Sequence, residues 1–175
     1  MIANTAGYDP LVLIRLAAPG DAEAIRVIYN DEVTSGVTTT FDIIPRTPAE
    51  QLEWLELHRG AHPALVAVDE PDGTVLGFGA LSPFRDRPAY ATTVENSVYV
   101  DQAHRGRGVG RAILDELVSL ADLHGFHTVV ARIVGHNEAS IALHLACGFD
   151  MVGTEREVGR KHGRWLDVVE LQRML

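Results

Sequence analysis

The sequence contains almost no cysteine and no long apolar run. Cys147 is the only cysteine among the 175 residues, so no internal disulfide can form and a reducing compartment is expected. No stretch approaches the ~20 consecutive apolar residues that a membrane-spanning helix needs. The beginning of the chain lacks a basic segment followed by an apolar one, so we expect no signal peptide. These absences predict a cytoplasmic protein without a membrane partner.

Positive charge is also scarce. The chain has 24 acidic residues against 15 basic ones, which gives a formal net charge of −9. A general nucleic-acid binder presents a basic face, so we expect no nucleic-acid partner. An acidic exterior weakly favours a cationic amine as the substrate.

The pattern of apolar residues predicts one α/β domain without repeats or linkers. We expect residues 12–175 to form this domain, preceded by a tail of residues 1–11. Strand and helix patterns alternate, which is typical of helices packed on a sheet. The expected strands are 11–16, 65–68, 75–81, 90–100, 128–134, 151–157 and 166–171, with a further strand or extended loop at 37–41.

Capping signals predict where the helices begin and end. Thr47-Pro48-Ala49-Glu50 has the form of a capping box with proline at the first helical position. Asp21 and Asn137 are candidate N-caps of two other helices, and Gly148 is a candidate C-terminal glycine. The longest expected helix runs from Val109 to about residue 124.

The most distinctive segment is His104–Arg111, with the sequence HRGRGVGR. Its three glycines cannot hold a regular helix or strand, but they allow the backbone to approach a ligand closely. A strand pattern precedes the segment, and the amphipathic helix that starts at Val109 follows it. A helix N-terminus presents unpaired N–H groups and the positive end of a dipole, which suit a phosphate group. Because Arg105, Arg107 and Arg111 add positive charge, the segment predicts a phosphate-binding loop.

Two common phosphate-binding motifs do not fit this loop. The dinucleotide fingerprint G-x-G-x-x-G needs a glycine where Arg111 stands, and the P-loop needs a Gly-Lys-Ser/Thr sequence that is absent. The spacing Arg105-x-x-Gly108-x-Gly110 instead resembles the R/Q-x-x-G-x-G/A loop of the GNAT (GCN5-related N-acetyltransferase) superfamily, which holds the pyrophosphate of acetyl-CoA. Taken alone, the loop is equally compatible with a glycine-rich connection that carries solvated arginines.

Three longer segments narrow the resemblance. Residues 14–42 (IRLAAPGDAEAIRVIYNDEVTSGVTTTFD), 85–100 (RDRPAYATTVENSVYV) and 137–173 (NEASIALHLACGFDMVGTEREVGRKHGRWLDVVELQR) resemble the phosphinothricin and methionine sulfoximine acetyltransferase family. The resemblance covers nearly all of the chain after residue 12. It implies the α/β GNAT fold, with a mixed central sheet of about six to seven strands flanked by about four helices. It also implies a homodimer with the site near the interface.

The activity implied by the resemblance is transfer of an acetyl group from acetyl-CoA to the amino group of a small amino-acid-like substrate. The amine would attack the thioester directly. The residues expected to hold acetyl-CoA are Val98, Tyr99, Val100, Arg105, Gly106, Arg107, Gly108, Val109, Gly110, Arg111, Asn137 and Ser140. Two alternatives stay open: a different amine, such as a protein N-terminus or a polyamine, and a non-catalytic acyl-CoA-binding domain.

Glu95 is the candidate base, because an alkylammonium group with a pKa near ~10 must lose a proton before it attacks. From the residues alone, a rim carboxylate paired with an arginine is the more frequent case, and imperfect alternation in the strand leaves the face of Glu95 open. The family motif V-E-x-S/T-V-Y-V implies that Glu95 is the catalytic glutamate, acting directly or through a water.

His144 is the candidate acid for the thiolate leaving group. It follows Asn137 by almost two helical turns, about 10.5 Å, so the two side chains are expected on the same side of the helix. Many GNAT proteins have a tyrosine at this place, and the histidine matches the phosphinothricin family. The alternative is a histidine with satisfied hydrogen bonds on a half-buried face.

Arg85 and Arg87 are two residues apart, so an extended loop would aim both the same way. Paired guanidinium groups suit a carboxylate or a phosphinate, although the residues alone favour a solvated loop. The resemblance implies that this loop forms the substrate pocket together with Phe41, Tyr90 and Ser97.

Other reactive side chains carry weaker hypotheses. His124 and His127 have a loose metal spacing that no carboxylate or cysteine pattern completes, so we expect no metal site. Cys147 follows His144 by three residues, but direct attack by an amine needs no thiol nucleophile. A buried cysteine at a helix end is the more common case.

Overall fold

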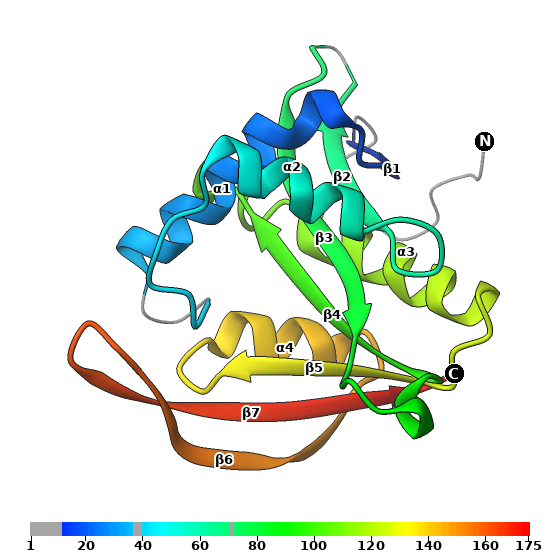
Figure 1. Cartoon of the computed structure of the whole chain (residues 1–175), viewed down its shortest axis with the longest axis vertical. Coiled ribbons are helices and arrows are strands. Elements are labelled where there is room, and N and C mark those ends of the chain that lie inside the picture. Colours follow the sequence, from blue (N-terminus) through cyan, green and yellow to red (C-terminus); the bar gives the residue numbers. More distant parts are fainter. Residues whose placement is uncertain (1–11, 37–39, 71) are drawn as a thin grey trace.

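The structure is a computed structural model that describes residues 12–36, 40–70 and 72–175. Its described strands form one sheet in the order β1-β2-β3-β4-β5-β7-β6 (Figure 1). Neighbouring strands are antiparallel except for β4 and β5, which are parallel. The strands are β1 (Val12–Leu16), β2 (Ala64–Asp69), β3 (Val75–Pro83), β4 (Thr93–Val100), β5 (Thr128–Val134), β6 (Asp150–Lys161) and β7 (Arg164–Met174). The expected mixed sheet of six to seven strands is confirmed.

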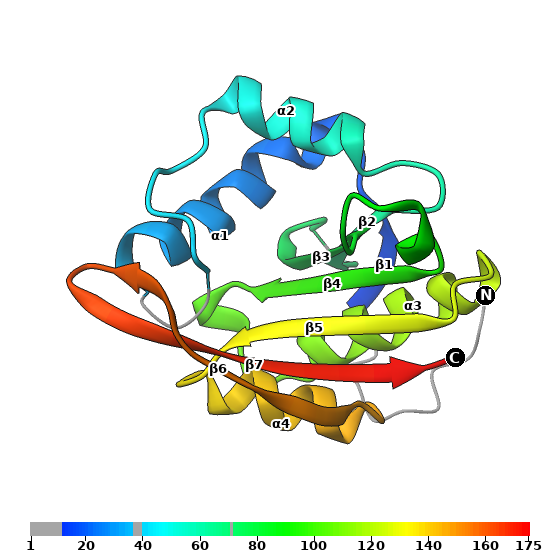
Figure 2. The ribbon, with the colours of Figure 1, turned by 60° about the horizontal axis from the view of Figure 1, so that its bottom comes forward.

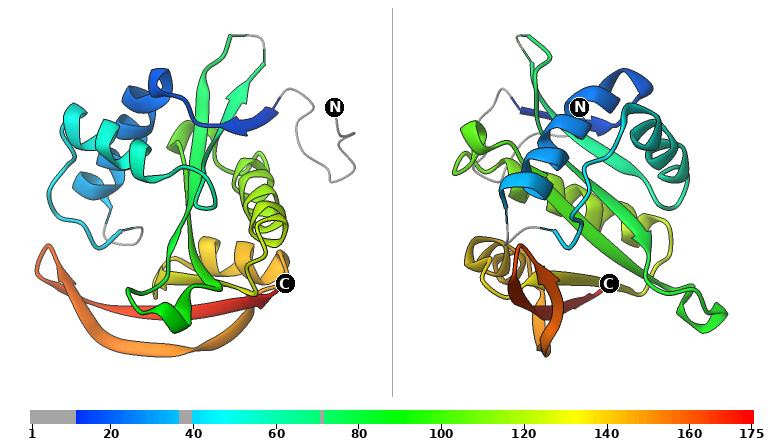
Figure 3. Two further views of the ribbon diagram at one scale, coloured as in Figure 1. Left: turned by 45° about the vertical axis from the view of Figure 1, so that its right-hand side comes forward. Right: turned by 60° about the vertical axis from the view of Figure 1, so that its left-hand side comes forward.

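Two pairs of helices cover the two faces of this sheet (Figures 2 and 3). The helices are α1 (Ala22–Ser35), α2 (Pro48–Leu57), α3 (Val109–Leu123) and α4 (Glu138–Ala146). Helices α1 and α2 pack with Val66 and Phe78 in one apolar core. Helix α3 packs with Val94 and Val129 in a second core on the other face, and α4 lies on that side as well. The sheet therefore has an α1/α2 face and an α3/α4 face.

The strands β4 and β5 pair over a short distance and then separate. Their register joins Thr93, Val94 and Glu95 to Thr128, Val129 and Val130, and no pairing follows for the rest of these two strands. Figure 1 shows β4 and β5 diverging from this point. The separation leaves a gap in the middle of the sheet, and the backbone groups that line it have no ladder partner across it.

Most of the capping predictions are confirmed. The Thr47 hydroxyl accepts a hydrogen bond from the Glu50 amide, and the Glu50 carboxylate accepts one from the Thr47 amide at 2.8 Å. The Asn137 side chain caps α4, and Gly148 has a φ of +79°. Asp21 lies at the N-cap position of α1 but does not cap it, because its carboxylate is bound by Arg15 and by the amide of Ala18.

Some predicted boundaries are wrong. The strand expected from residue 90 begins at Thr93, because Pro88 starts a short 3₁₀ turn that ends at Tyr90. The two closing strands are longer than expected and continue almost to the turn at His162. The predicted tail 1–11 and most of the predicted 37–41 segment lie outside the described residues. No helix in the described part of the chain is long and apolar enough to cross a membrane.

Candidate active site

A cavity of about 630 Å³ lies where β4 and β5 separate. Its walls come from the diverging halves of these two strands, the glycine loop, the start of α3, and α4. Residues 40–42 and Glu32 of α1 close it on the α1/α2 side. Eleven of the twelve residues predicted to hold acetyl-CoA line this cavity, and Arg107 is the exception. The structure therefore brings the predicted loop, strand and helix residues to one place.

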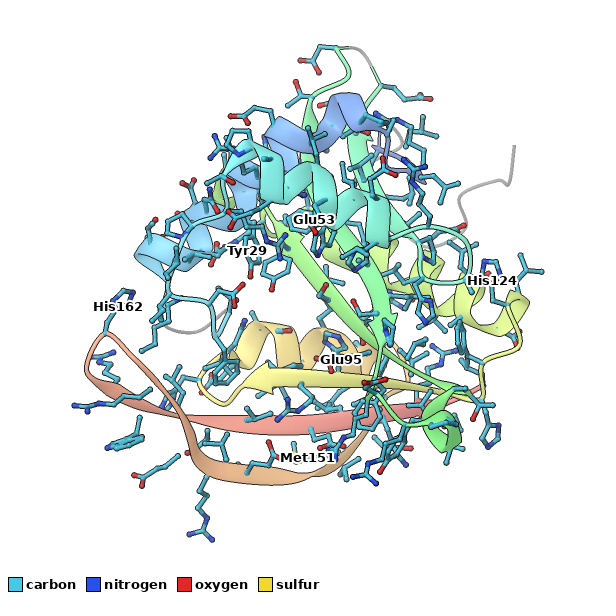
Figure 4. The ribbon with its side chains drawn as sticks, in the orientation of Figure 1. Tyr29, Glu53, Glu95, His124, Met151 and His162 are labelled. Carbon is cyan, nitrogen blue, oxygen red and sulfur yellow. The ribbon has the colours of Figure 1, made fainter. Side chains whose placement is uncertain are left out.

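Glu95 lines the cavity from β4, at the last position where β4 pairs with β5. It shares the α1/α2 face with Tyr99, since Tyr99 stacks on Phe78 of the α1/α2 core at 5.0 Å between ring centroids. This answers the question of its orientation that the sequence left open. Figure 4 shows Glu95 in the middle of the molecule, beside β4 and β5.

The surroundings of Glu95 favour its protonated form. Burial raises the pKa of its carboxyl group, the charge of Glu170 raises it further, and Arg132 and Arg85 oppose the rise. A carboxylate that binds a proton more readily than usual, in a cavity, is a candidate general base.

The glycine loop enters α3 through two residues with left-handed backbone. Gly106 has a φ of +77° and Gly108, which is the N-cap of α3, has a φ of +81°. A side chain at either position would be strained, so glycine is required by the backbone itself. The first N–H groups of α3 have no partner within the helix and lie at the wall of the cavity. This arrangement suits an anion such as a pyrophosphate.

Arg105 is held in place by a buried carboxylate. Its guanidinium forms an ion pair with Glu32 of α1, which is 5% exposed, and its Nε donates to the backbone oxygen of Val100 at 3.3 Å. Both Arg105 and Glu32 line the cavity. Arg107 instead contacts the Nδ1 atom of His104 at 3.1 Å.

His144 lines the cavity from α4 and is 3% exposed. Its Nδ1 lies 2.8 Å from the backbone oxygen of Ser140, and its Nε2 lies 2.9 Å from the Nδ2 of Asn96. A carbonyl oxygen accepts and an amide nitrogen donates, so Nδ1 carries the proton and Nε2 is an acceptor. Burial lowers the pKa of His144, which fits a neutral ring. In this form the ring has no proton on Nε2 to give to a leaving group.

The residues predicted to bind the substrate lie in two separate places. Phe41 and Ser97 line the cavity. The ring of Phe41 packs so closely over Gly159 of β6 that an added Cβ at Gly159 would lie 2.5 Å from it. Arg85, Arg87 and Tyr90 are exposed and do not line the cavity.

The loop that carries Arg85 has contacts of its own. The guanidinium of Arg85 lies 4.8 Å from the ring centroid of Phe84 and 5.8 Å from that of Tyr90. It is close enough to Glu95 to lower the pKa of that carboxyl. The role of this loop in substrate binding stays a prediction.

Two charged residues that line the cavity, and one that binds its wall, were missed by the sequence reasoning. Arg132 of β5 lines it and is bound by Glu155 of β6 at 2.5 Å. Glu32 falls on the apolar face of α1, one helical turn after Ile28 and two after Ile25, so its helical position was a usable signal of a buried carboxylate. Lys161 is the only lysine in the sequence and is 1% exposed. Its burial depends on contacts between distant segments, which the sequence does not reveal.

Metal and thiol chemistry find little support among the described residues. They contain no group of three or more histidine, cysteine, aspartate or glutamate side chains that could hold a metal ion. Cys147 is buried, and burial raises its pKa to about 11, so its thiol is a poor nucleophile near neutral pH.

Comparisons with known proteins give a family and several relatives. The model of the Acetyltransferase (GNAT) family matches residues 24–149. Phosphinothricin N-acetyltransferase from Streptomyces coelicolor is 40% identical over 166 residues, which cover 94% of this chain and 96% of that protein. The L-methionine sulfoximine/L-methionine sulfone acetyltransferase of Pseudomonas paraeruginosa is 39% identical, covering 91% and 92%. The crystal structure of a phosphinothricin acetyltransferase from Sinorhizobium meliloti in complex with acetyl-CoA has a TM-score of 0.88 at 39% identity, covering 94% of this chain and 89% of that one.

Proposed function

Because the chain belongs to the acetyltransferase (GNAT) family, we propose that it acetylates the amino group of small amino-acid-like substrates, of the phosphinothricin or methionine sulfoximine and sulfone type. The observation that carries the proposal is the gap between β4 and β5, which has Glu95 at one end and the glycine loop at the other. The family resemblance predicted from the sequence is confirmed, and the chain is an N-acetyltransferase.

The residues around the gap fit acetyl-CoA. The left-handed glycines and the N-terminus of α3 would hold the pyrophosphate, with Arg105 and Arg111 supplying positive charge. On the side where the strands separate, the backbone of Val98 to Val100 has no pairing with β5 and offers hydrogen bonds to an extended amide-bearing chain. Asn137 and Ser140 lie on the opposite wall. When bound, acetyl-CoA supplies the thioester that the amine attacks.

Glu95 takes the proton from the substrate ammonium in this proposal, directly or through a water. Its raised pKa brings it closer to the operating pH, which is where a general base works best. The charge of Arg132 opposes this rise in pKa and so favours the ionised carboxylate that accepts the proton. Phe41 and Ser97 would contact the amine substrate on the same side of the sheet.

We also propose a cytoplasmic homodimer in which the loop of Arg85, Arg87 and Tyr90 reaches a substrate. Several large apolar side chains are exposed on the outer strands, which suits a partner surface: Met151, Val152, Val158 and Trp165. Light scattering after gel filtration tests the dimer, and a monomeric mass at micromolar concentration would contradict it.

A substrate panel tests the activity. The purified protein, acetyl-CoA and each of the free amino acids, phosphinothricin, methionine sulfoximine, methionine sulfone, spermidine and a peptide N-terminus are assayed for release of CoA thiol. We expect the highest kcat/KM with the phosphinothricin and methionine sulfoximine group. A preference for spermidine or the peptide would transfer the function to a different amine, and acetyl-CoA binding without turnover of any amine would make the protein a non-catalytic binder.

A further inference from the structure

His58 lies at the C-terminal end of α2 and is joined to the sheet. Its Nδ1 is 2.7 Å from the backbone oxygen of Trp54, and its Nε2 is 3.0 Å from the Oγ of Ser82 in β3. The carbonyl oxygen can only accept, so the ring proton is on Nδ1 and the Ser82 hydroxyl donates to Nε2. The ring also stacks on Trp54 at 4.0 Å between centroids, which fixes its orientation.

Ser82 stands directly opposite Glu95 in the register of β3 and β4. Residues directly opposite each other in an antiparallel pair point to the same face, with Cβ atoms about 4.5–5.5 Å apart. Because its own proton is directed to His58, the Ser82 oxygen presents its lone pairs as acceptors. A protonated Glu95 side chain can donate to this oxygen directly or through one water.

We propose that Glu95, Ser82 and His58 form a proton relay that carries the proton of the substrate amine out of the active site. The relay rests on the proposed acetyltransferase function and extends it. Its outer end lies at a second cavity of about 430 Å³, which His58 lines together with Arg59, Glu116 and His124. This cavity lies at the end of β1 that contains Leu16 and the end of β2 that contains Ala64. None of the described residues that line it comes from the glycine loop.

Each step moves one proton, and the completed cycle leaves no charge on the relay. The ammonium proton passes to the Glu95 carboxylate, and then to the Ser82 oxygen while the original Ser82 proton passes to Nε2 of His58. Glu95 is again a carboxylate, Ser82 is again a neutral hydroxyl, and His58 is an imidazolium that still donates from Nδ1 to Trp54. The imidazolium then loses one ring proton to water in the second cavity, which His58 lines, and the ring is neutral again. The single proton released by acetylation of an ammonium is thereby accounted for.

The charges around the two ends suit a transfer between them. Burial raises the pKa of Glu95, with Glu170 adding to the rise and Arg132 and Arg85 opposing it. Burial lowers the pKa of His58, and the charges of Arg46 and His62 lower it further, while its hydrogen bond to Trp54 raises it. The carboxyl and the imidazole are thus brought closer in proton affinity than free glutamate and histidine are. A small difference allows the proton to pass without being trapped on either group.

The test removes the hydroxyl and supplies another proton acceptor. In dilute buffer at neutral pH, we expect Ser82→Ala to lower kcat about 10-fold or more and to leave the KM for acetyl-CoA unchanged. Rising concentrations of imidazole buffer should restore the kcat of Ser82→Ala, whereas wild-type kcat should change little. Ser82→Thr keeps a hydroxyl and should recover most of the loss. His58→Gln should show the same buffer dependence, and His127→Ala, which removes an exposed histidine outside the relay, should not.

The outcomes separate the relay from the function on which it rests. Wild-type kcat in Ser82→Ala at low buffer would overturn the relay, and so would a loss that imidazole does not reverse and that Ser82→Thr shares. Either result leaves a wild-type enzyme that acetylates its amine, so the proposed function survives. A wild-type protein that acetylates no amine would remove the proposed function and the relay together.

Discussion

Glu95 and His144 lie on opposite faces of the central sheet. Glu95 is on the α1/α2 face with Tyr99, whereas His144 of α4 is bound to Asn96, the next residue along β4, on the other face. Both side chains reach the same cavity because it passes through the gap between β4 and β5. An amine and a thioester that meet in this gap would approach from different sides, with Glu95 on the side of the amine.

Replacement of Glu95 tests its role as the base. Bringing two reactants together supplies roughly 7–11 kcal/mol of a barrier, whereas a positioned base supplies about 10²–10⁴ in rate. We therefore expect Glu95→Gln to lower kcat/KM by about 10²–10⁴ near neutral pH and to bind acetyl-CoA normally. Part of the loss should recover as the pH rises toward the pKa of the amine. Steady-state kinetics from pH 6 to 9 measure this, and an equal loss at every pH would assign Glu95 a structural role.

The same substitution should stabilise the protein at neutral pH. The folded protein raises the pKa of Glu95, mainly through burial, so the folded state binds this proton more tightly than the unfolded state. Stability is then lost as the pH rises from the unfolded value near ~4.3 through the folded pKa, and glutamine removes this loss. Thermal unfolding at pH 7.5 should show a higher Tm for Glu95→Gln, and the gain should shrink toward pH 4. Glu53→Gln, on the exposed face of α2 (Figure 4), is the matched control and should leave Tm unchanged.

His144 offers a test that distinguishes an acid from a structural histidine. A general acid would lose about 10²–10⁴ in kcat on replacement, but a neutral ring whose Nε2 accepts from Asn96 predicts that His144→Gln loses less than about 10-fold. Because burial lowers its pKa, His144 makes the protein less stable as the pH falls below the unfolded value near ~6.5. Urea unfolding at pH 5.5 and 7.5 should therefore show a smaller pH effect in His144→Gln. A kcat loss of a thousand-fold would restore the acid role.

The sequence predicted local structure well and side-chain neighbours poorly. The capping box at Thr47 and the glycine loop before α3 depend on residues close in the chain, so their patterns are visible in the sequence. The gap between β4 and β5 depends on where two strands stop pairing, and no local pattern records that.

The same distinction explains the charged residues of the site. Lys161 and Glu32 are brought together from distant segments, so neither Glu32 in the cavity wall nor the lysine that binds its backbone was identified. The face of Glu95 follows from Tyr99, four residues along β4, which stacks on Phe78 of the α1/α2 core; the imperfect alternation of β4 did not reveal this. Arg85 and Arg87 are exposed in the loop between the end of β3 at Pro83 and the 3₁₀ turn that starts at Pro88.

Replacement of Gly108 tests whether the glycine loop binds the pyrophosphate of acetyl-CoA. Its φ of +81° is a conformation that a β-branched residue adopts only with strain, and a side chain there would also stand between the backbone and a pyrophosphate. We expect Gly108→Val to abolish acetyl-CoA binding or to weaken it by at least about 100-fold, measured by calorimetry. Gly125→Val is the matched control, because Gly125 has a φ of +78° in open space away from the cavity. If both variants bind acetyl-CoA equally, the loop does not hold the cofactor.

Replacement of Lys161 tests whether its hydrogen bonds fix the position of the cavity wall on the α1/α2 side. From the end of β6, its Nζ donates to the backbone oxygens of Glu32 and Thr40, both at 3.2 Å. These bonds fix the end of α1 and the segment of Phe41 against β6, where the Phe41 ring rests on Gly159. Lys161→Met keeps the volume but leaves two buried carbonyls without a donor, which costs about 1–3 kcal/mol for each group.

The expected result of Lys161→Met is a selective loss at the amine site. The KM for the amine should rise about 10-fold or more, while the KM for acetyl-CoA rises less, because the glycine loop and α4 are not bound by Lys161. Arg160→Met is the control, since Arg160 is the preceding residue of the same strand but is exposed and lies over Trp165. Its kinetics and unfolding should match the wild type. Equal increases of both KM values in Lys161→Met would show that the whole domain is loosened and that Lys161 does not specifically position the wall that faces the amine.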